Sequence, residues 1–199
     1  MKRPTLLLLS ILSICSQLSF DAWDTSAQGT SATGLHRTHW TAADEKDLLA
    51  KAREGNREAQ FWLGTAYEQG FLGSPDFRES LKWFRKAAAH GDPDAQNALG
   101  QMYENGEGVS ADCTLAAKWY LKAANHVPNL GGAGQGRNNL GLLYLDGRGV
   151  PKDFINAYMW FRLADVAPNL AIARAQLTSA QVEKAERMVL KWRRDHRQL

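Results

Sequence analysis

Two glutamates, Glu68 and Glu104, occupy the same position in successive copies of a recurring pattern, 36 residues apart. Two carboxylates are the minimum set for hydrolysing a glycosidic bond, with one acting as general acid and the other as nucleophile or general base. On neighbouring helices, whose axes pack about 8 to 10 Å apart, such carboxyl groups can reach a workable separation. The pair therefore keeps a hydrolase open as one interpretation of the chain.

Other side chains with catalytic or metal-binding chemistry are isolated in the sequence. Cys113 follows Asp112 at the expected start of a helix, where the helix N-terminus lowers a thiol pKa, but no histidine partner is identifiable for it. His36 and His39 lie together in a polar N-terminal stretch. Because no Ser/His/Asp set, metal-ligand cluster or phosphate-binding loop stands out, we expect a non-enzymatic protein without cofactor or metal.

The elements that carry these residues form an internal repeat. Counted from a leucine, glycine follows at +1, tyrosine at +4, glycine at +7, aspartate at +13 and tryptophan at +20. The pattern starts at Leu63, Leu99 and Leu140, at intervals of 36 and 41 residues, which is the range of helix-pair solenoids. Apolar residues three or four positions apart, and glycine-rich turns, predict that each copy is a helix, a turn and a second helix. Such units become stable by stacking on one another.

Three sets of equivalent residues have structural interpretations. The aspartates precede the second helices and are expected to be N-caps, worth roughly 1 kcal/mol each. The glycines lie inside the first helices, where glycine costs about 1 kcal/mol, so we expect a close helix approach there. The tryptophans, each followed by another aromatic residue, are expected to form layers of a continuous core. The sets are Asp76, Asp112 and Asp153; Gly64, Gly100 and Gly141; and Trp83, Trp119 and Trp160, followed by Phe84, Tyr120 and Phe161.

The frame Ala-x-x-x-Leu-Gly-x-x-Tyr-x-x-Gly-x-Gly-Val-x-x-Asp-x-x-x-Ala-x-x-Trp-aromatic-x-x-Ala-Ala resembles the Sel-one-like repeat (SLR), a relative of the tetratricopeptide repeat (TPR). The copy from Ala95 to Ala124 matches nearly throughout, whereas the first copy has Ser80 in place of the alanine and lacks the Gly-Val turn. The resemblance implies an all-α fold, a right-handed superhelical solenoid of three full repeats with a flanking half-repeat and a C-terminal capping helix. The solenoid is placed at 42–199, with repeats at about 57–92, 93–127 and 135–167 and the capping helix at about 178–196.

Two connections depart from the repeat pattern. Residues 125–136 are five residues longer than the matching link after the first repeat and contain four glycines, which predicts a mobile loop. Pro168 and Asn169 are expected to break the chain after the third repeat. Thr178 and Gln181 then have the form of a capping box that opens the last helix. The residues of that helix expected to face the array are Val182, Ala185, Val189 and Trp192.

The N-terminal residues have the form of a secretory signal. Lys2 and Arg3 precede an apolar stretch from Thr5 to Phe20, which is short for a membrane span and ends in small and polar residues. We expect a signal peptide at 1–27, a disordered spacer at 28–41 and no membrane span in the mature chain. The protein is then periplasmic or extracellular, with retention of the segment as an uncleaved membrane anchor as the alternative.

The charge balance excludes a strongly basic nucleic-acid-binding protein. The formal net charge is +3, from 24 Lys and Arg residues against 21 Asp and Glu residues. The basic residues concentrate on the second helices and the C-terminal tail, where long-range electrostatics could attract anionic envelope polymers. They are Lys82, Arg85, Lys86, Lys118, Lys122, Arg162, Lys191, Arg193, Arg194 and Arg197.

By resemblance to TPR proteins, the first helices line a concave groove that receives a peptide. Asn97 and Asn138 share one register, and a carboxamide can both donate to and accept from a peptide backbone. We therefore predict an adaptor of the bacterial cell envelope that binds a protein or peptide partner and no nucleic acid. A weak hydrolase, or a peptidoglycan- or glycan-binding protein of the periplasm, is the alternative. The candidate groove residues are Phe61, Thr65, Glu68, Asn97, Gln101, Glu104, Asn138, Leu142 and Leu145.

Overall fold

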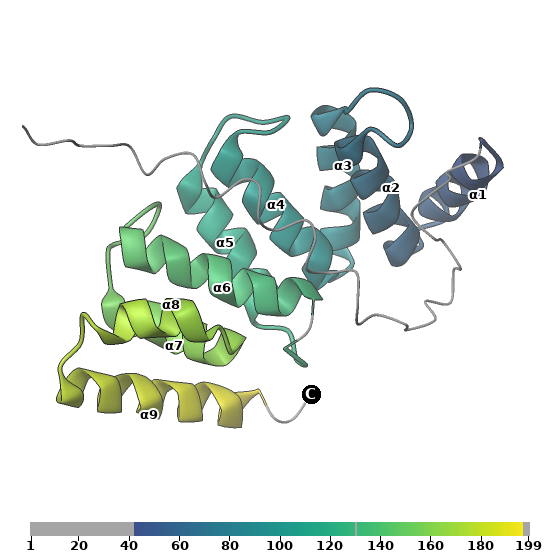
Figure 1. Ribbon diagram of the computed structural model, residues 1–199. Helices are drawn as coiled ribbons and strands as arrows, with labels where there is room; N and C mark the ends of the chain where they lie inside the picture. Colours follow the sequence, from purple (N-terminus) through teal and green to yellow (C-terminus); the bar gives the residue numbers. More distant parts are fainter. Residues whose placement is uncertain (1–41, 130, 197–199) are drawn as a thin grey trace, which may run out of the picture. The chain divides into compact units, whose positions relative to one another are not determined.

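The computed structural model describes residues 42–129 and 131–196, which form α-helices and no β-strand (Figure 1). The predicted signal peptide and spacer, with His36 and His39, lie outside the described residues. The helices in chain order are α1 (Ala42–Arg53), α2 (Arg57–Gln69), α3 (Phe77–Ala89), α4 (Pro93–Asn105), α5 (Cys113–Ala124), α6 (Gly131–Asp146), α7 (Phe154–Ala164), α8 (Ala167–Arg174) and α9 (Ser179–Asp195).

Consecutive helices pack on each other to form the predicted units. α2 contacts α3, α4 contacts α5, and α6 contacts α7, so each repeat is a helix, a turn and a second helix. The repeats stack because α3 contacts α4, α5 contacts α6, and the first helices α4 and α6 also touch. α1 packs on α2 as a half-repeat, and both α8 and α9 pack on α7 (Figure 1).

The second helices begin at the predicted aspartate N-caps. The Asp76 carboxylate accepts the N–H groups of Arg78 and Glu79, and Asp112 and Asp153 accept equivalent first-turn N–H groups 2.8 to 3.1 Å away. Each carboxylate satisfies N–H groups that have no partner inside the helix and meets the positive end of the helix dipole. The predicted role of the three aspartates is confirmed.

The glycines inside the first helices make room for a ring from the second helix of the same repeat. A Cβ atom on Gly64 would lie 2.6 Å from the Phe84 ring, one on Gly100 would lie 2.3 Å from the Tyr120 ring, and one on Gly141 would lie 2.6 Å from the Phe161 ring. No side chain fits at these distances. The predicted close approach of the two helices in each repeat is therefore confirmed.

The innermost aromatic layer differs from the predicted one. Phe84, Tyr120 and Phe161 are 0 to 1% exposed, whereas the preceding tryptophans are less deeply placed. Trp119 is only half-buried, and the Lys122 ammonium lies 4.0 Å from its ring centroid. Trp83 and Trp160 are nevertheless buried in the core and Trp119 packs against it, so the predicted layers are present. Their innermost part is the aromatic residue that follows each tryptophan, because that residue faces the glycine.

Two predicted interruptions are helices in the structure. The segment predicted as a mobile loop includes the first turns of α6, which begins at Gly131. The Asp94 carboxylate of α4 accepts the Gly132 N–H at 2.6 Å and so caps α6 from another helix. Pro168, predicted to break the chain, lies in the first turn of α8, where proline needs no N–H partner.

The last helix matches its prediction. Thr178 and Gln181 form a capping box in which each accepts the backbone N–H of the other, and α9 starts one residue later. Ala185 and Val189 are buried, and Val182 and Trp192 pack beside them on the array. None of the described helices is both long and apolar enough to cross a membrane.

Candidate protein-interaction surface

The nine predicted groove residues lie on α2, α4 and α6, three on each helix. On α2, the half-buried Phe61 ring packs against Phe84, with ring centroids 5.7 Å apart, and against Trp62 at 5.4 Å. The Thr65 hydroxyl donates to the Phe61 carbonyl one turn earlier at 3.2 Å. Phe61, Thr65 and Glu68 share one face of α2, because residues three, four and seven positions apart align on a helix.

The asparagines of this surface bond to neighbouring helices. Asn97 is 2% exposed, and its Nδ2 donates to Gln135 at 2.8 Å while its Oδ1 accepts from the Asn139 amide at 3.0 Å. Asn138 Oδ1 accepts from the Asn169 amide of α8 at 2.7 Å. These bonds form a ladder of amides that links α4 to α6 and α6 to α8. In this state Asn97 stabilises the stack.

The remaining α4 and α6 residues divide into exposed and packed positions. Gln101 is exposed to solvent. Leu142 and Leu145 are partly buried against an apolar cluster that includes Phe161 and Ala185. Gln101 is the exposed position among the nine, while the α2 residues keep partly exposed side chains, as Asn138, Leu142 and Leu145 do on α6.

Glu104 takes part in a network between two repeats. Its carboxylate accepts from the Tyr120 hydroxyl at 2.7 Å and forms an ion pair with the Arg148 guanidinium, which also pairs with Asp146. Tyr120 is fully buried, and burial together with the Glu104 charge raises the pKa of its hydroxyl well above the usual value. Both oxygens of Glu104 are used in this network.

Glu68 has different surroundings although it has the same register. Burial raises the pKa of its carboxyl group, the Gln69 amide donates to Oε2 at 3.2 Å, and the charge of Glu107 raises the pKa further. The structure thus gives the two glutamates of the hydrolase interpretation unlike surroundings. Glu104 is held by a hydroxyl and a guanidinium, whereas Glu68 accepts from the Gln69 amide.

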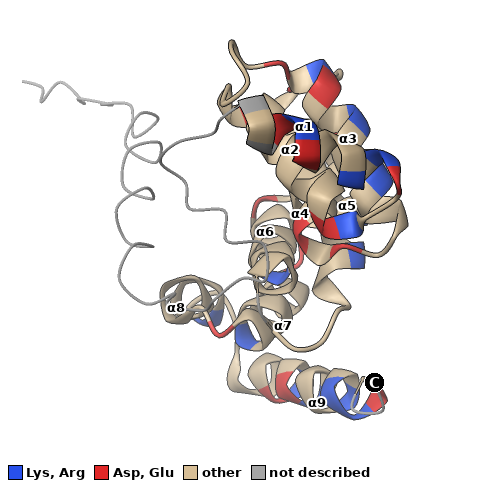
Figure 2. Cartoon of the chain, turned by 90° about the vertical axis from the view of Figure 1, so that its right-hand side faces the viewer, with Lys and Arg blue, Asp and Glu red and all other residues tan. Residues whose placement is uncertain are grey.

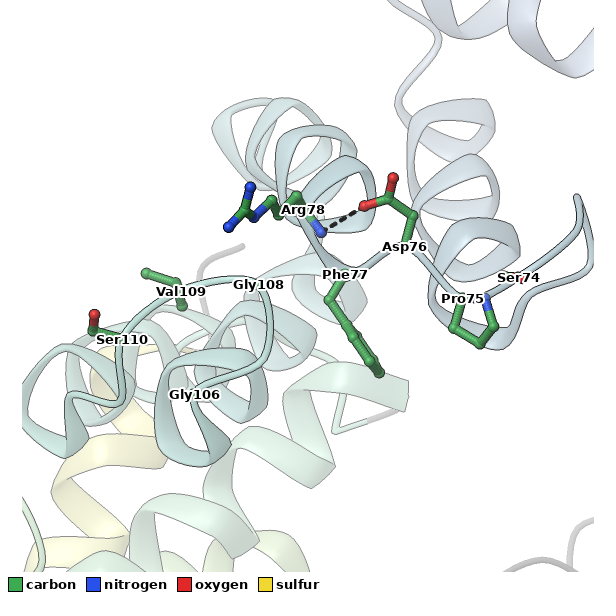
Figure 3. Close-up of a pocket in the computed structure, with 9 residues that line it drawn as sticks. All are labelled: Ser74, Pro75, Asp76, Phe77, Arg78, Gly106, Gly108, Val109 and Ser110. Carbon is green, nitrogen blue, oxygen red and sulfur yellow. Dashed lines mark hydrogen bonds between the residues drawn. The ribbon is translucent and has the colours of Figure 1, made fainter.

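A cavity of about 830 Å³ lies between the turn before α3 and the turn before α5 (Figure 3). The Asp76 side chain there bonds to the N–H of Arg78 as the cap of α3 (Figure 3). Neither Glu68 nor Glu104 lines this cavity, and the described residues hold no cluster of three or more metal-ligating side chains. The lining residues are Ser74, Pro75, Asp76, Phe77, Arg78, Gly106, Gly108, Val109 and Ser110.

A second set of buried polar residues was not predicted from the sequence. The Gln60 amide donates to the Ala52 carbonyl in the last turn of α1 at 3.0 Å. The Gln96 amide donates to the Ala88 carbonyl in the last turn of α3 at 3.3 Å. Each also bonds through Oε1 to a histidine ring, and because a carbonyl oxygen accepts, the histidine nitrogen must carry the proton. The sequence did carry a signal for this set, because Gln60 and Gln96 lie 36 residues apart, and so do His90 and His126.

Arg137 occupies the equivalent position in the third repeat and is 2% exposed. Its guanidinium donates to the carbonyls of Ala124, His126 and Leu163 and lies 4.6 Å from the Trp192 ring centroid. Burial lowers the pKa of Arg137 to about 10, with a smaller contribution from Arg193, so the group is charged at neutral pH. The negative ends of α5 and α7 compensate this charge.

Many residues of the predicted basic strip are engaged within the chain. Figure 2 marks where Lys and Arg lie along the helices. Lys82 pairs with Glu79, Arg162 pairs with Glu186, and Arg85 donates to the Tyr103 hydroxyl at 2.6 Å. The Lys86 and Lys122 ammonium groups lie over tryptophan rings. Lys118, Lys191, Arg193 and Arg194 are exposed, while Arg197 lies outside the described residues.

The helix pairs coincide with matches to a known repeat. The model of the Sel1 repeat matches residues 57–92, 93–126 and 134–164, which hold α2 with α3, α4 with α5, and α7 with all of α6 but its first three residues. The chain belongs to the Sel1 repeat family. Sel1 repeat proteins generally act as protein-interaction modules, and this fold is typically a scaffold without enzymatic activity.

Two solved Sel1 repeat structures share the solenoid fold. One is a protective antigen of uropathogenic Escherichia coli with an SLR fold, 24% identical, with a TM-score of 0.57 over 77% of this chain and 41% of that chain. The other is a Sel1 repeat protein from Oxalobacter formigenes, 31% identical, with a TM-score of 0.55 over 64% of this chain and 49% of that chain. The chain thus spans less than half of the length of either one. No curated protein sequence matches it.

Proposed function

We propose that this Sel1 repeat protein is a non-enzymatic adaptor of the bacterial cell envelope that binds a protein or peptide partner on the face of its first helices. The observation that carries the proposal is the contrast along that face. The amide ladder of Asn97 and Asn138 closes α4, α6 and α8 onto one another. Phe61, Glu68 and Gln101, in contrast, keep exposed or half-buried groups, and Gln101 has the register of Thr65.

The chemistry of this face suits a polypeptide. Phe61 offers an apolar surface, Thr65 keeps its oxygen lone pairs as acceptors, and Gln101 offers an exposed carboxamide that can donate and accept. A peptide presents apolar side chains and backbone groups together, which is the combination that these residues can bind. Exposed Lys191 and Arg193 extend the proposal to contact with anionic envelope polymers.

Site-specific photocrosslinking tests this assignment. A photoreactive amino acid replaces Thr65 or Gln101 on the proposed face, and Lys118 on a second helix serves as the matched control, since it is exposed as well. We expect the same adduct from both first-helix positions and none from Lys118. Equal adducts from all three positions would move the binding face elsewhere, and no adduct from any position in the envelope fraction would contradict the adaptor.

The envelope location rests on the N-terminal sequence and has its own test. Lys2 and Arg3 followed by an uncharged apolar stretch have the form of an export signal. We expect mature protein in the periplasmic fraction with an N-terminus close to Gln28. Full-length protein in the membrane fraction would establish the anchored alternative, and full-length protein in the cytoplasm would contradict export.

A further inference from the structure

The cavity between the turn before α3 and the turn before α5 is lined by a separate set of residues from the face of the first helices (Figure 3). None of the nine candidate groove residues lines it. Its volume of about 830 Å³ lies within the range of known ligand-binding pockets. The cavity is therefore a candidate site that the proposed function does not use.

The two sides of the cavity are joined by a backbone contact, the first junction. A Cβ atom on Gly108 would lie 2.4 Å from the Phe77 carbonyl oxygen, so the turn before α5 rests directly on the start of α3. The next repeat has the same contact, the second junction, because a Cβ atom on Gly149 would lie 2.2 Å from the Cys113 carbonyl oxygen. This contact is a repeated structural feature, and its requirement is a glycine in the turn.

The side chains of the first junction differ from those of the second. The first has an aromatic ring, a guanidinium and a serine where the second has a thiol, a hydroxyl and a proline. These residues are, in the same order, Phe77, Arg78 and Ser110 at the first junction and Cys113, Thr114 and Pro151 at the second. Because both junctions make the same backbone contact, the stacking of repeats does not explain the three residues of the first one.

Phe77 and Pro75 give the cavity an apolar part. The Phe77 side chain is 37% exposed, and Figure 3 shows its ring between the two turns. At the same position in the third repeat, Phe154 packs against the apolar cluster of Phe161, and the Lys152 ammonium lies 5.1 Å from its ring centroid. No ring or cation of the described residues stacks on Phe77. Its ring is therefore available to an apolar group from outside the chain.

A second part of the cavity is rich in hydrogen-bond donors. The Arg78 side chain extends toward Val109 and Ser110 (Figure 3). Among the described residues, its guanidinium has neither a hydrogen-bond acceptor nor an ion-pair partner. The backbone N–H groups of Gly108, Val109 and Ser110 likewise have no acceptor in the described part of the chain. Consecutive N–H groups of a turn beside a guanidinium suit a carboxylate ligand.

The acidic groups nearby are held by other partners. Asp76 Oδ1 accepts the N–H groups of Arg78 and Glu79 at 3.0 Å, so the start of α3 compensates its charge. Figure 3 shows the Asp76 and Arg78 side chains directed to opposite sides. Glu107 does not line the cavity, and its carboxylate accepts from the Asn105 amide at 3.4 Å. The donor-rich part therefore favours an anion.

We propose that this cavity binds a carboxylate that lies next to an apolar side chain in a polypeptide. The Arg78 guanidinium and the N–H groups of Val109 and Ser110 bond to the carboxylate, and the apolar side chain packs on Phe77 and Pro75. Two places in a polypeptide offer this pair of groups: an apolar C-terminal residue, and an apolar residue beside an aspartate or glutamate. The inference goes beyond the proposed function, because it concerns the turns between helices.

The test is a titration of the intact protein with short peptides, followed by the N–H signals of the backbone and of Arg78 in NMR spectra. Acetyl-alanyl-leucine with a free carboxylate is the main probe, and its C-terminal amide is the uncharged control of nearly the same shape. We expect saturable shifts at Val109, Ser110 and Arg78 with the free acid and none with the amide. Acetyl-leucyl-aspartyl diamide, which carries its carboxylate on a side chain, shows which of the two sources binds more tightly.

Two variants remove donors while keeping residues that the next repeat tolerates. Arg78→Thr introduces the residue that α5 has at this position, and Ser110→Pro removes an N–H group as Pro151 does. We expect each variant to bind the free acid at least about tenfold more weakly. Arg53→Thr, at an exposed position on α1, is the matched control for loss of one positive charge and should leave binding unchanged.

Three results would overturn the inference. They are equal shifts with the free acid and the amide, no shift at Val109 and Ser110 with either carboxylate probe, and binding of acetate as tight as that of the peptide acid. The proposed function is judged separately by the photocrosslinks at Thr65 and Gln101. Crosslinks without a response to the carboxylate probes would keep the adaptor and reject only the cavity site.

Discussion

The side chain of Ser80 places a hydroxyl oxygen in the apolar interior of the protein. It occupies the position that Ala116 and Ala157 hold in the other repeats, and all three residues are 0% exposed. The hydroxyl oxygen of Ser80 has no hydrogen-bond partner among the described residues. A buried polar group without a partner loses its hydration and gains nothing in return.

We expect Ser80→Ala to stabilise the protein by about 1 kcal/mol, since the substitution removes this unpaired hydroxyl and leaves the packing unchanged. Chemical denaturation of the wild type and the variant measures the difference in the free energy of unfolding. Ala116→Ser is the matched reverse substitution and should destabilise by a similar amount. A stabilising Ala116→Ser, or a destabilising Ser80→Ala, would show that the hydroxyl finds a partner.

Glu68 gives a prediction about pH. Because burial and Glu107 raise its pKa in the folded state, the folded protein binds this proton more tightly than the unfolded chain does. The contribution of Glu68 to stability is then fully present below the unfolded pKa of about 4.3 and is lost as pH rises through the folded pKa. Glu68→Gln should therefore be more stable than the wild type at neutral pH.

Thermal or urea unfolding of wild type and Glu68→Gln across a pH series checks this expectation. The difference in the free energy of unfolding should shrink as pH falls and disappear below about pH 4. A difference that stays constant with pH would mean that the amide changes packing and not charge. Glu183→Gln, which removes one negative charge at an exposed position on α9, is the matched control.

For single residues, the sequence predicted the roles that recur in every repeat and missed the roles that occur once. The capping aspartates and the helix glycines recur at fixed spacing, so the spacing alone indicated their roles. It could not indicate the groups bonded to Asn97, because Gln135 and Asn139 are about forty residues away in the chain and depend on how α4 meets α6.

At the scale of elements, α6 shows why composition misled the prediction. Its first turns are rich in glycine, which indicates a loop when only local propensity is considered. In the structure, a Cβ atom on Gly132 would lie 2.2 Å from the Pro93 carbonyl oxygen, and one on Gly136 would lie 2.7 Å from the Ala123 Cβ. These glycines permit α6 to approach α4 and α5, so tertiary packing overrides their low helix propensity.

Asp94 is expected to decide whether the start of α6 is ordered. Its carboxylate on α4 accepts the Gly132 N–H, and a capping bond of this kind is worth about 1 kcal/mol. Asp94→Ala should lower stability by about that amount and speed hydrogen exchange of the first turn of α6. Asp94→Asn keeps an acceptor oxygen and should lose less. Unchanged exchange at Gly132 in Asp94→Ala would show that packing alone orders this turn.

At the scale of the whole described array, one type of bond recurs at the successive interfaces. Gln60, Gln96 and Arg137 each lie in a first helix and donate to the end of the helix before it. In a stacked array each repeat depends mainly on its neighbours, so removing one such bond should act locally. The repeat period predicted this stacking, but it does not encode the three carbonyl partners of Arg137, which come from two different helix ends and the turn between repeats.

Arg137→Ala should therefore loosen one end of the array. The carbonyls of Ala124, His126 and Leu163 lose their donor, and Trp192 of α9 loses the guanidinium that lies over its ring, so we expect a loss of about 3 kcal/mol. Hydrogen exchange should rise most in α7 and α9 and least in α2 and α3. Arg137→Gln, which restores the residue of the other repeats, should recover part of the loss through the Ala124 carbonyl alone.

Gln96→Ala removes the corresponding bond at the preceding interface between repeats. This glutamine bonds to the Ala88 carbonyl and to the His126 ring, so its loss should raise exchange around α3 and α4 while α9 stays protected. Two distinct exchange maps would establish that each interface holds its own neighbours. A uniform rise over all described helices in both variants would instead mean that the array unfolds as a single cooperative unit, since no local opening would then precede global unfolding.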